Sequence, residues 1–276
     1  MSLKKLVNTL TEEIKKKGSV IVAFSGGVDS SVAAALAYKA LKNRALAVTI
    51  NSPLLPYGEI ANAKRVAKEI GIRHLVVKLN ELRLKDFAKN PPNRCYICKK
   101  FRFKVLKKIA IKKNFNVVMD GTNLDDAGEY RPGLLALKEE NIYSPFLEHG
   151  LGKMLIRRLA KNLRLSVYNK PSSACLASRF PYWVKLSLDK LKRVDKAESY
   201  IKAKLGLNVV RVRDHGELAR IEIEKKDYKV FLSNEKSVDD VISKLRRLGF
   251  KFITLDLEGY RSGSFDYQFK GWKTKS

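Results

Sequence analysis

A glycine-rich loop carries the strongest chemical signal in the sequence. Ser25-Gly26-Gly27-Val28-Asp29-Ser30 follows a strand expected over Ser19–Phe24. Two adjacent glycines allow a tight turn with accessible amides, and the start of the next helix adds partial positive charge. Asp29 would repel phosphate unless a divalent cation lies between them, so the loop predicts a phosphate site with Mg²⁺. The Gly-Lys-Ser/Thr of a Walker loop is absent, and an ordinary strand–helix turn capped by Asp29 and Ser30 is the alternative.

Three cysteines form a second candidate site. Cys95 and Cys98 open a helix expected over Arg94–Lys113, where the helix N-terminus favours the thiolate form, and Cys175 follows much later. Three cysteines in 276 residues are not a disulfide framework. The residues leave four interpretations open: a structural zinc site completed by a histidine, a redox dithiol, buried inert thiols, and an iron–sulfur cluster held by three thiolates. The only candidates for that histidine are His74, His149 and His215.

The elements that must position these residues alternate between strand and helix. Strands are expected over Ser19–Phe24, Ala45–Ile50, Ile72–Lys78 and Asn116–Asp120, and helices over Leu3–Lys17, Val32–Leu41, Gly58–Ile70, Arg94–Lys113 and Gly152–Leu163. In the fourth helix, Ile97, Phe101, Val105 and Ile109 recur every four residues and predict its apolar stripe. Short strands separated by helices predict an α/β fold with a doubly wound parallel sheet. Ligands bind such sheets at the carboxyl ends of the strands, where both candidate sites are expected.

A different pattern follows Lys170-Pro171-Ser172-Ser173. Helices are expected over Leu188–Leu205 and Ser237–Leu248, and strands over Asn208–Arg213, Leu218–Glu224 and Phe250–Leu257, with an irregular tail from Gly259. This order predicts a smaller α+β domain. We place the boundary after Phe180, which gives domains of residues 1–180 and 181–276.

The net charge is +28, from 56 Lys and Arg against 28 Asp and Glu. This excess favours an anionic partner, such as a nucleotide, a phosphorylated small molecule or nucleic acid. A lysine-rich, heat-adapted composition is the alternative, since glutamine occurs only at Gln268. No apolar run approaches the ~20 residues of a membrane span, and the N-terminus lacks an apolar signal segment. We therefore expect a cytoplasmic protein without membrane contacts.

Several segments carry a resemblance to known proteins. The loop Ser25–Ser30 resembles that of the ATP pyrophosphatase (PP-loop) superfamily, whose members bind the pyrophosphate of ATP and cleave between the α and β phosphates. The chain also resembles the LarE family, ATP-dependent sulfur transferases that build the nickel-pincer nucleotide cofactor of lactate racemase. This second resemblance rests on Asp120–Asp126, Glu129–Gly133, Lys170–Tyr182, Arg211–Gly216 with Ala219–Glu222, and Leu257–Ser264.

The resemblance implies a reaction and a set of site residues. A carboxylate of a pyridinium dicarboxylate mononucleotide is adenylated with Mg·ATP and then converted to a thiocarboxylate by sulfide or another sulfur donor. The implied pyrophosphate ligands are Ser25, Gly26, Gly27, Asp29 and Ser30; Ser178 and Arg179 lie near the nucleotide, and Arg211 and Arg213 bind the substrate phosphate. Glu198 and Glu222 are implied metal ligands, and Cys175, Asp29 and Asp126 are implied catalytic residues. For Arg211 and Arg213 a solvated strand face is the alternative, for the two glutamates salt bridges, and for Asp126 a capping role.

Within that family, some members sacrifice the sulfur of one cysteine, whereas others carry a [4Fe–4S] cluster. With Cys95, Cys98 and Cys175 the chain resembles the second group, in which the open iron could hold a hydrosulfide. The family also tends to form homo-oligomers, with the second domain serving substrate binding and oligomerisation. Trp183 departs from the family pattern, which has glycine after Tyr182.

Three other functions compete with this interpretation. A tRNA thiolase would also explain the net charge, but no further cysteine pairs or RNA-binding module are visible. An amidotransferase-type synthetase would use ammonia and need no cysteine. A nucleotide-sensing or RNA-binding protein would retain the loop without the reaction.

Overall fold

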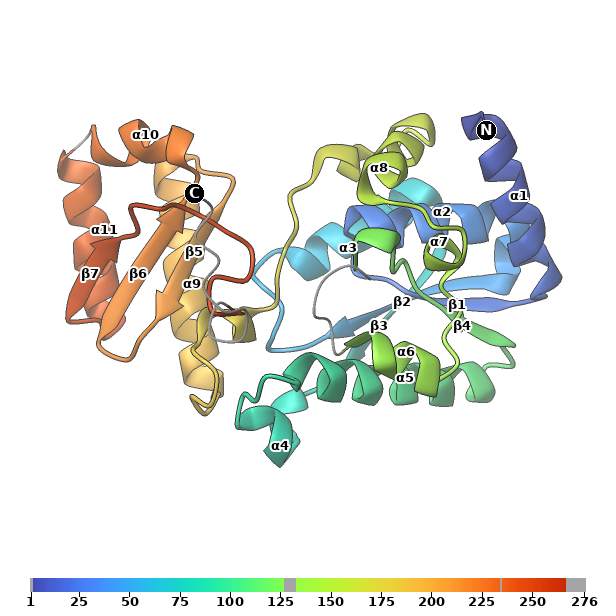
Figure 1. Cartoon of the computed structure of the whole chain (residues 1–276), viewed down its shortest axis with the longest axis horizontal. Coiled ribbons are helices and arrows are strands. Elements are labelled where there is room, and N and C mark those ends of the chain that lie inside the picture. The colour runs from blue at the N-terminus through green and yellow to red at the C-terminus, as the bar shows by residue number, and fades with distance from the viewer. Residues whose placement is uncertain (1, 127–132, 234, 267–276) are drawn as a thin grey trace, which may run out of the picture. The chain divides into compact units, whose positions relative to one another are not determined.

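The computed structural model describes residues 2–126, 133–233 and 235–266 (Figure 1). Contacts divide the chain into two compact units, Met1–Glu81 with Asn93–Ser172, and Leu82–Pro92 with Ser173–Ser276. The domain boundary expected after Phe180 stays a prediction. Among the described residues, no helix is both long and apolar enough to cross a membrane.

The first unit contains a sheet of four parallel strands, β1 (Val20–Ala23), β2 (Ala45–Asn51), β3 (Arg73–Lys78) and β4 (Val117–Met119). Their order is β3-β2-β1-β4. The chain therefore proceeds outward from β1 to β3 and then returns to the other side of β1. In such sheets the loops on either side of this reversal separate and leave room for a ligand at the carboxyl ends of the strands. Here those loops follow β1 and β4.

Helices cover both faces of this sheet, as the doubly wound prediction requires (Figure 1). Alternate strand residues point to opposite faces, so Val20 and Val22 pack in the core under α1, α2, α3 and α8, whereas Ile21 packs in the core under α5 and α6. A sheet buried on both faces favours continuous apolar runs over alternation, and β1 and the first four residues of β2 are apolar throughout. The helix bounds are α1 Leu3–Lys16, α2 Val28–Leu41, α3 Glu59–Ile70, α4 Lys85–Ala88, α5 Arg94–Lys112, α6 Gly133–Glu139, α7 Pro145–Glu148 and α8 Lys153–Asn162.

The inward face of α5 differs from the predicted one. Phe103, Leu106 and Ala110 are buried against the sheet, whereas Ile97 and Phe101 are only partly buried and lie outside that core. A strict repeat of four residues drifts around the helix, because four residues turn it through more than a full circle. The predicted stripe was therefore wrong at the N-terminal half of the helix.

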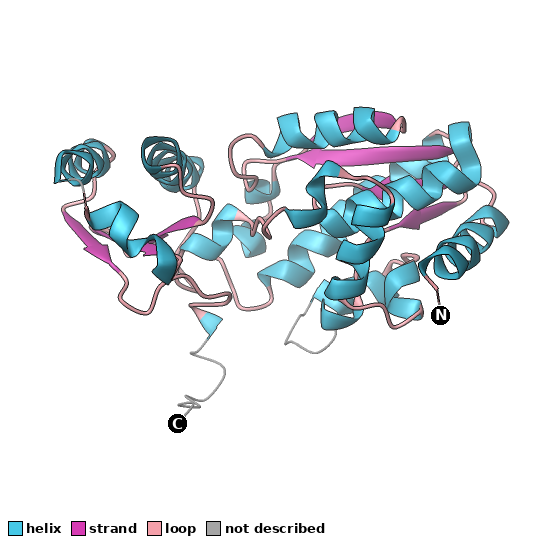
Figure 2. Cartoon of the chain, turned by 90° about the horizontal axis from the view of Figure 1, so that it is seen from above, coloured by secondary structure: helices cyan, strands magenta, loops and turns pink. Residues whose placement is uncertain are grey.

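The second unit is an α+β fold of three strands and flanking helices. Strands β5 (Val210–Asp214) and β6 (Leu218–Ile223) form an antiparallel hairpin, and β7 (Phe252–Leu255) pairs in parallel with β6. Helices α9 (Leu188–Leu205) and α11 (Glu235–Arg247) lie on one side of the strands and are seen end-on in Figure 2; α10 is Tyr228–Leu232. This agrees with the predicted hairpin and helices.

Strand β5 has one apolar and one basic face. Val210 and Val212 pack in the core with α9 and α11. Arg211 and Arg213 alternate with them and so lie on the other face, although both side chains are buried. The segment after β7 covers this face, since Tyr260 contacts Arg211 and Phe265 contacts Arg213. The predicted irregular tail is described only as far as Asp266, where it forms turns.

Candidate active site

The loop between β1 and α2 is folded around the Ser30 hydroxyl group. The Ser25 amide donates to Ser30 Oγ (3.2 Å), Ser30 Oγ donates to the Gly27 carbonyl (3.2 Å), and the two serine hydroxyls lie 3.0 Å apart. Helix α2 begins at Val28, four residues before the predicted start, so Asp29 and Ser30 lie in its first turn. The loop therefore presents hydroxyls and helix N-terminal amides together, an arrangement suited to phosphate.

Two glycines are required by close approach in this region. Gly26 has φ +71°, and a Cβ atom there would lie 2.7 Å from the Ala63 Cα atom. Gly121, after β4, would place a Cβ atom 2.7 Å from the Asp29 carbonyl carbon and 2.8 Å from the Ser30 amide nitrogen. The loops after β1 and β4 thus touch at Asp29, which fixes this residue at the reversal of strand order.

A cavity of about 280 Å³ opens at this point in the first unit. Its polar lining residues, with the two glycines, are Ser25, Gly27, Asp29, Ser30, Thr49, Lys99, Arg102, Asp120, Gly121, Thr122 and Asp126, and its apolar lining residues are Ala23, Phe24, Val48, Ile50, Leu55, Phe103 and Leu106. A cavity with both apolar residues and hydroxyl, amide and cationic groups suits a nucleotide.

Two carboxylates that line this cavity, those of Asp29 and Asp126, interact electrostatically. Burial raises the pKa of Asp29, the Asp126 charge raises it further, and Lys153 and Arg157 lower it. Asp126 lies 3.6 Å from Lys153 Nζ, and its Oδ2 atom accepts the Asn123 amide at 3.4 Å. Mg²⁺ is commonly held by one or two carboxylates together with substrate phosphates, so this pair fits a Mg²⁺·nucleotide.

The neighbouring acids have structural contacts instead. Asp120 accepts hydrogen bonds from the Ser144 hydroxyl (2.6 Å) and the Thr122 hydroxyl (2.5 Å), and Asp125 accepts the Lys153 amide at the start of α8. The capping contact considered for Asp126 is present as well, because Asp126 and Asn123 each accept the other's backbone amide, at 3.4 and 3.3 Å, whereas Asp125 caps α8.

Lys99 and Arg102 were missed by the sequence reasoning. They lie one turn apart on α5, and both line the cavity. Arg102 Nε and Nη2 lie 2.7 Å from Oε1 of the buried Glu81. The chain has ten basic and no acidic residues from Lys89 to Lys113, but the predicted stripe turned these two outward. They would have been found by starting the stripe from Phe103 and Leu106.

Cys95 and Cys98 lie in the first turns of α5 and are exposed and partly exposed, respectively. Tyr96, between them, is fixed by its hydroxyl group, which donates to Glu139 Oε2 (2.7 Å) and accepts from Lys100 Nζ (2.8 Å). Lys100 and Glu139 pair at 2.6 Å. This contact with α6 holds the turn that carries both thiols.

Cys175 lies in the second unit, is exposed, and immediately precedes the 3₁₀ turn η5 (Leu176–Arg179). Arg179 is fully buried and pairs with Glu198 at 2.7 Å. Trp183, further along this segment, is 66% exposed with φ +67°. Its left-handed conformation explains why glycine suits this position.

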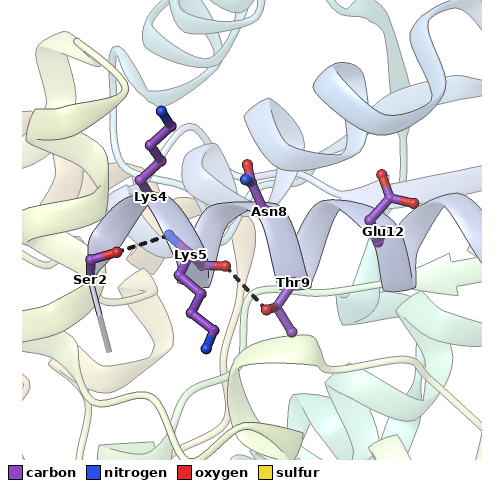
Figure 3. A pocket seen from close by; sticks show the side chains of 6 residues that line it. All are labelled: Ser2, Lys4, Lys5, Asn8, Thr9 and Glu12. Atoms are coloured by element: carbon purple, nitrogen blue, oxygen red, sulfur yellow. Dashed lines mark hydrogen bonds between the residues drawn. The ribbon is translucent and has the colours of Figure 1, made fainter.

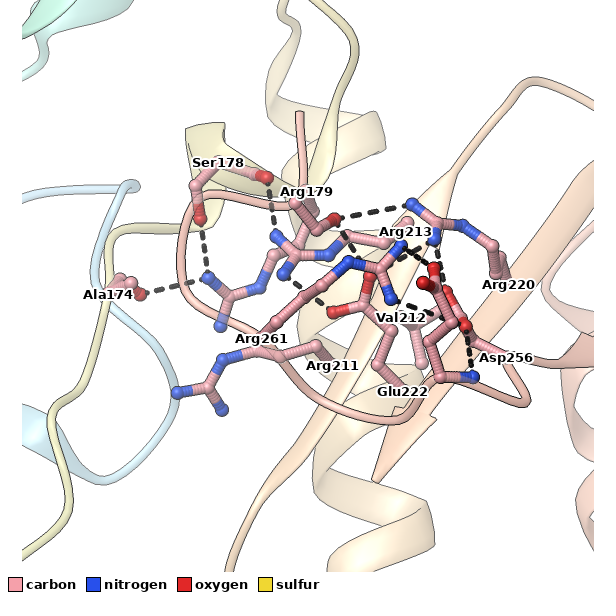
Figure 4. A network of polar contacts seen from close by, with 12 residues as sticks. Ala174, Ser178, Arg179, Arg211, Val212, Arg213, Arg220, Glu222, Asp256 and Arg261 are labelled. Carbon is pink, nitrogen blue, oxygen red and sulfur yellow. Dashed lines mark hydrogen bonds and ion pairs between the residues drawn. The ribbon is translucent and has the colours of Figure 1, made fainter. Parts of the chain in front are cut away.

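The basic face of β5 carries a network of ion pairs (Figure 4). Arg213 pairs with Glu222 (2.7 Å), which also accepts from Ser264 Oγ (2.8 Å) and lies 3.3 Å from Arg220. Burial lowers the pKa of Arg211, and the charge of Arg179 lowers it further. A buried cation beside other cations would be stabilised by an anion, so this face fits a phosphate group.

Both glutamates implied as metal ligands are occupied by arginines. In the part of the chain that the structure describes, no three Asp, Glu, His or Cys side chains come together as a metal site. The salt bridges considered for Glu198 and Glu222 are present, and a metal role for them stays a prediction. The histidines also have polar or aromatic contacts: His74 with Thr49 (2.7 Å), His149 with Glu13 (2.7 Å) and His215 with Phe265.

Two regions contribute nothing to this site. A shallow hollow along α1 is lined only by residues of Ser2–Glu12, which belong to that helix and its cap (Figure 3). Glu129, Tyr130, Arg131 and Pro132, part of the family-like pattern, lie outside the described residues.

Several known proteins are similar to this chain. The family model described as NAD synthase matches residues 2–129. An uncharacterised protein of Synechocystis sp. is 40% identical over 89% of this chain and 91% of its own length. The pyridinium-3,5-bisthiocarboxylic acid mononucleotide synthase of Lactiplantibacillus plantarum is 37% identical over 92% of this chain and 91% of its own length. One subunit of the glutamine-hydrolysing GMP synthase of Archaeoglobus fulgidus is 28% identical over 49% of this chain and 45% of its own length. The similarity to the bisthiocarboxylic acid synthase thus extends over nearly the whole chain.

Proposed function

Because the chain belongs to the LarE family, we propose that it is an ATP-dependent sulfur transferase that converts a carboxylate of a pyridinium dicarboxylate mononucleotide to a thiocarboxylate. The name of the L. plantarum relative specifies a bisthiocarboxylic acid mononucleotide product, and the similarity covers both units. The product would serve the assembly of a nickel-pincer cofactor.

The observation that carries the proposal is the cavity at the reversal of strand order. It combines the Ser25–Ser30 loop, the carboxylates of Asp29 and Asp126, and apolar lining residues that a base could contact. Loop amides and hydroxyls would bind the β and γ phosphates, and the two carboxylates would hold Mg²⁺ on them. Lys99 and Arg102 would balance phosphate charge from the α5 side.

These residues favour transfer of AMP. A substrate carboxylate oxygen attacks the α-phosphorus, the bond from this phosphorus to the bridging oxygen breaks, and pyrophosphate leaves with Mg²⁺. The loop and the carboxylates stabilise the charge that develops on that leaving group. A sulfur nucleophile then attacks the acyl carbon, the C–S bond forms, and AMP departs as the C–O bond breaks.

The substrate phosphate would bind the basic face of β5. Arg211 and Arg213 point to the same side of the strand, and guanidinium groups bind phosphate with good geometry. An anion there would offset the cost of burying Arg211 beside Arg179.

The chemistry of the cysteines fits an iron–sulfur cluster. Cys95 and Cys98 are accessible at a helix N-terminus, where thiolates are stabilised, and Cys175 is exposed. When bound, a [4Fe–4S] cluster with three protein ligands would supply an open iron for a hydrosulfide. The three cysteines would hold it, and no cysteine sulfur would be consumed.

The test measures adenylation and sulfur transfer separately. We expect carboxylate-dependent ATP–pyrophosphate exchange with pyridinium dicarboxylate mononucleotide, and thiocarboxylate product when a sulfur donor is added. Asp29→Asn should abolish both, whereas Cys175→Ala should abolish only the second. If the Cys175→Ala variant instead retains ATP–pyrophosphate exchange and forms an amide when ammonia is added, the amidotransferase-type reaction of the GMP synthase relatives would be favoured.

The cluster has its own test. Protein purified without oxygen should contain iron and acid-labile sulfide, and its mass should not change during turnover. Zinc without iron would contradict the cluster, and a loss of ~34 Da per turnover would indicate a sacrificed cysteine sulfur. We also propose a homo-oligomer working in the cytoplasm, which sedimentation and cell fractionation would check.

A further inference from the structure

The guanidinium group of Arg179 bonds on two edges. Its Nε and Nη2 atoms donate to the two carboxylate oxygens of Glu198 at 2.7 and 3.0 Å. Its Nη1 atom donates to the carbonyl oxygens of Ala174 and Cys175, both at 3.1 Å, and to Ser178 Oγ at 2.8 Å (Figure 4). All three guanidinium nitrogens are therefore engaged within the second unit.

The carbonyl group of Cys175 is the centre of this arrangement. Besides Arg179 Nη1, it accepts the Ser178 amide at 3.0 Å and the Ser178 hydroxyl at 2.8 Å. A carbonyl oxygen has two lone pairs, so these donors crowd around it and fix its direction. The thiol of the same residue remains exposed. The backbone of Cys175 is thus fixed while its sulfur stays accessible.

Glu198 connects this turn to the strand that carries the basic face. Its Oε1 atom accepts both Arg179 Nε (2.7 Å) and the Val212 amide (3.0 Å), and Val212 lies between Arg211 and Arg213. Each carboxylate oxygen of Glu198 already accepts a donor. The contacts therefore run without a break from the Cys175 carbonyl through Arg179 and Glu198 to β5.

Arg179 and Glu198 are buried, which limits their contacts to groups inside the protein. Arg179 is 0% and Glu198 2% exposed. Burial alone would disfavour both charges, but the charge and hydrogen bonds of the partner, together with smaller contributions from neighbouring groups, outweigh it, so the pKa of Arg179 is raised and that of Glu198 lowered. Replacing an internal partner by a metal or a nucleotide would leave a buried charge uncompensated. Arg179 and Glu198 therefore compensate each other's charge within the second unit.

We propose that Arg179 and Glu198 are positioning residues that fix the Cys175 turn relative to the substrate-binding face of β5, rather than ligands of nucleotide or metal. The inference rests on the proposed function, in which Cys175 is required for sulfur transfer. It replaces the roles that the family resemblance implied for these two residues.

The main variant is Arg179→Lys, which keeps a positive charge for Glu198 but loses the second edge that reaches the carbonyls. Arg193→Lys is the matched control, because Arg193 also pairs with a carboxylate, Asp214, and donates to a backbone carbonyl, that of Gly216. It lies in the same unit but does not contact the Cys175 turn. A third variant, Ser178→Ala, removes one donor to the Cys175 carbonyl and one acceptor of Arg179 Nη1, and it replaces no charged residue.

Two measurements report on the conformation of the Cys175 turn without depending on catalysis. One is the alkylation rate of Cys175 by iodoacetamide in a Cys95→Ser/Cys98→Ser background, where it is the only cysteine. The other is hydrogen exchange at the Ser178 amide in the full chain. We expect Arg179→Lys to accelerate exchange and change the alkylation rate by about tenfold, with Ser178→Ala changing both less and Arg193→Lys neither.

Kinetics then separate positioning from binding. Arg179→Lys should leave the KM for ATP and the ATP–pyrophosphate exchange rate nearly unchanged, and should lower the kcat of thiocarboxylate formation by about 10²-fold, the effect of a small misplacement. A raised KM for ATP, with alkylation and Ser178 exchange as in the parent protein, would overturn the proposal. If Arg179→Lys does not fold, Ser178→Ala decides instead. A Ser178→Ala variant with the parent's alkylation rate and the parent's exchange rate at residue 178 would then overturn the proposal.

The two proposals fail in different ways. If Cys175→Ala still forms thiocarboxylate, the proposed route of sulfur is wrong, whereas alkylation and exchange still decide whether the pair fixes the turn. If sulfur transfer needs Cys175 but the turn does not respond to Arg179→Lys, only the positioning role is wrong.

Discussion

Gly121 and Asp29 meet so closely that a Cβ atom on Gly121 would lie 2.7 Å from the Asp29 carbonyl carbon. The loops after β4 and β1 therefore form one surface, and the position of the phosphate loop depends on a glycine outside it. Asp29 is thus fixed from both sides of the cavity.

Gly121→Ala should displace the start of α2. Overpacking of this kind costs about 1–3 kcal/mol, and we expect ATP–pyrophosphate exchange to fall by about 10²-fold. Gly150→Ala is the control, because it introduces left-handed strain, at φ +63°, but its methyl group would meet open space. Thermal unfolding and exchange rates check both variants, and a fully active Gly121→Ala protein would show that the loops can separate.

Asp29 should set the acid limit of ATP binding. Burial and the Asp126 charge raise the pKa of Asp29, so it takes up a proton at a higher pH than an ordinary carboxyl group and then loses its attraction for Mg²⁺. Asp126→Asn removes one cause and should shift this acid limit to lower pH, while weakening Mg²⁺ binding. The check is the pH dependence of ATP affinity at saturating Mg²⁺, compared between Asp126→Asn and the parent protein. An acid limit at the same pH in both proteins would contradict the electrostatic coupling of Asp29 and Asp126.

The same shift has a stability consequence of definite sign. A raised pKa in the folded state means that the folded protein holds the proton more tightly than the unfolded chain. Without ligand, Asp29 therefore destabilises the fold above its folded pKa. This cost decreases as the pH falls below that value and disappears only below the pKa of Asp29 in the unfolded chain. Asp29→Asn should be more stable than the parent at neutral pH in chemical unfolding, although inactive.

Lys99 should contribute to adenylation. Lys99→Met keeps the aliphatic stem, which packs on Gly133, but removes the charge from the cavity, and we expect exchange to fall by about 10²-fold. Lys108→Met removes the same charge from an exposed position of α5 and should have little effect. Equal activities of the two variants would show that Lys99 does not act on the phosphates.

Tyr96 should help retain the proposed cluster. Tyr96→Phe loses the hydroxyl contacts to Glu139 and Lys100 that hold the Cys95–Cys98 turn, and outer contacts of this kind change metal affinity by about 10–100-fold. Iron release to a chelator should therefore be faster. Tyr168→Phe, which changes a half-exposed tyrosine elsewhere in the first unit, should release iron at the parent rate.

Local signals in the sequence were sufficient for much of this architecture. The strand–glycine–helix pattern at Ser25–Ser30 located the turn between β1 and α2, and alternation along β5 placed Arg211 and Arg213 on one face. The predictions failed where burial depends on distant segments. Lys99 and Arg102 face the cavity because α5 packs through Phe103, Leu106 and Ala110, and the apolar residues of this helix allow more than one stripe, between which the sequence alone did not decide.

The ion pair of Arg179 and Glu198 could not be predicted for a related reason. The two residues are 19 positions apart, and their pairing depends on how η5 packs against α9 and β5. From the family resemblance, Arg179 was expected near the nucleotide and Glu198 was expected to bind a metal. The two hydrogen bonds between their side chains show that they pair with each other, and the bonds to the Cys175 carbonyl and from the Val212 amide connect the pair to the turn and to β5.

The two faces of β5 link accurate folding to anion recognition. If the hairpin formed with β5 shifted by one residue against β6, Val210 and Val212 would turn outward and both arginines would enter the helix-covered core. Such a misregistered hairpin would lose its packing, and it would also lose the paired guanidinium groups that we propose bind the substrate phosphate. Under that proposal, a phosphorylated compound bound to this face would favour the correct pairing.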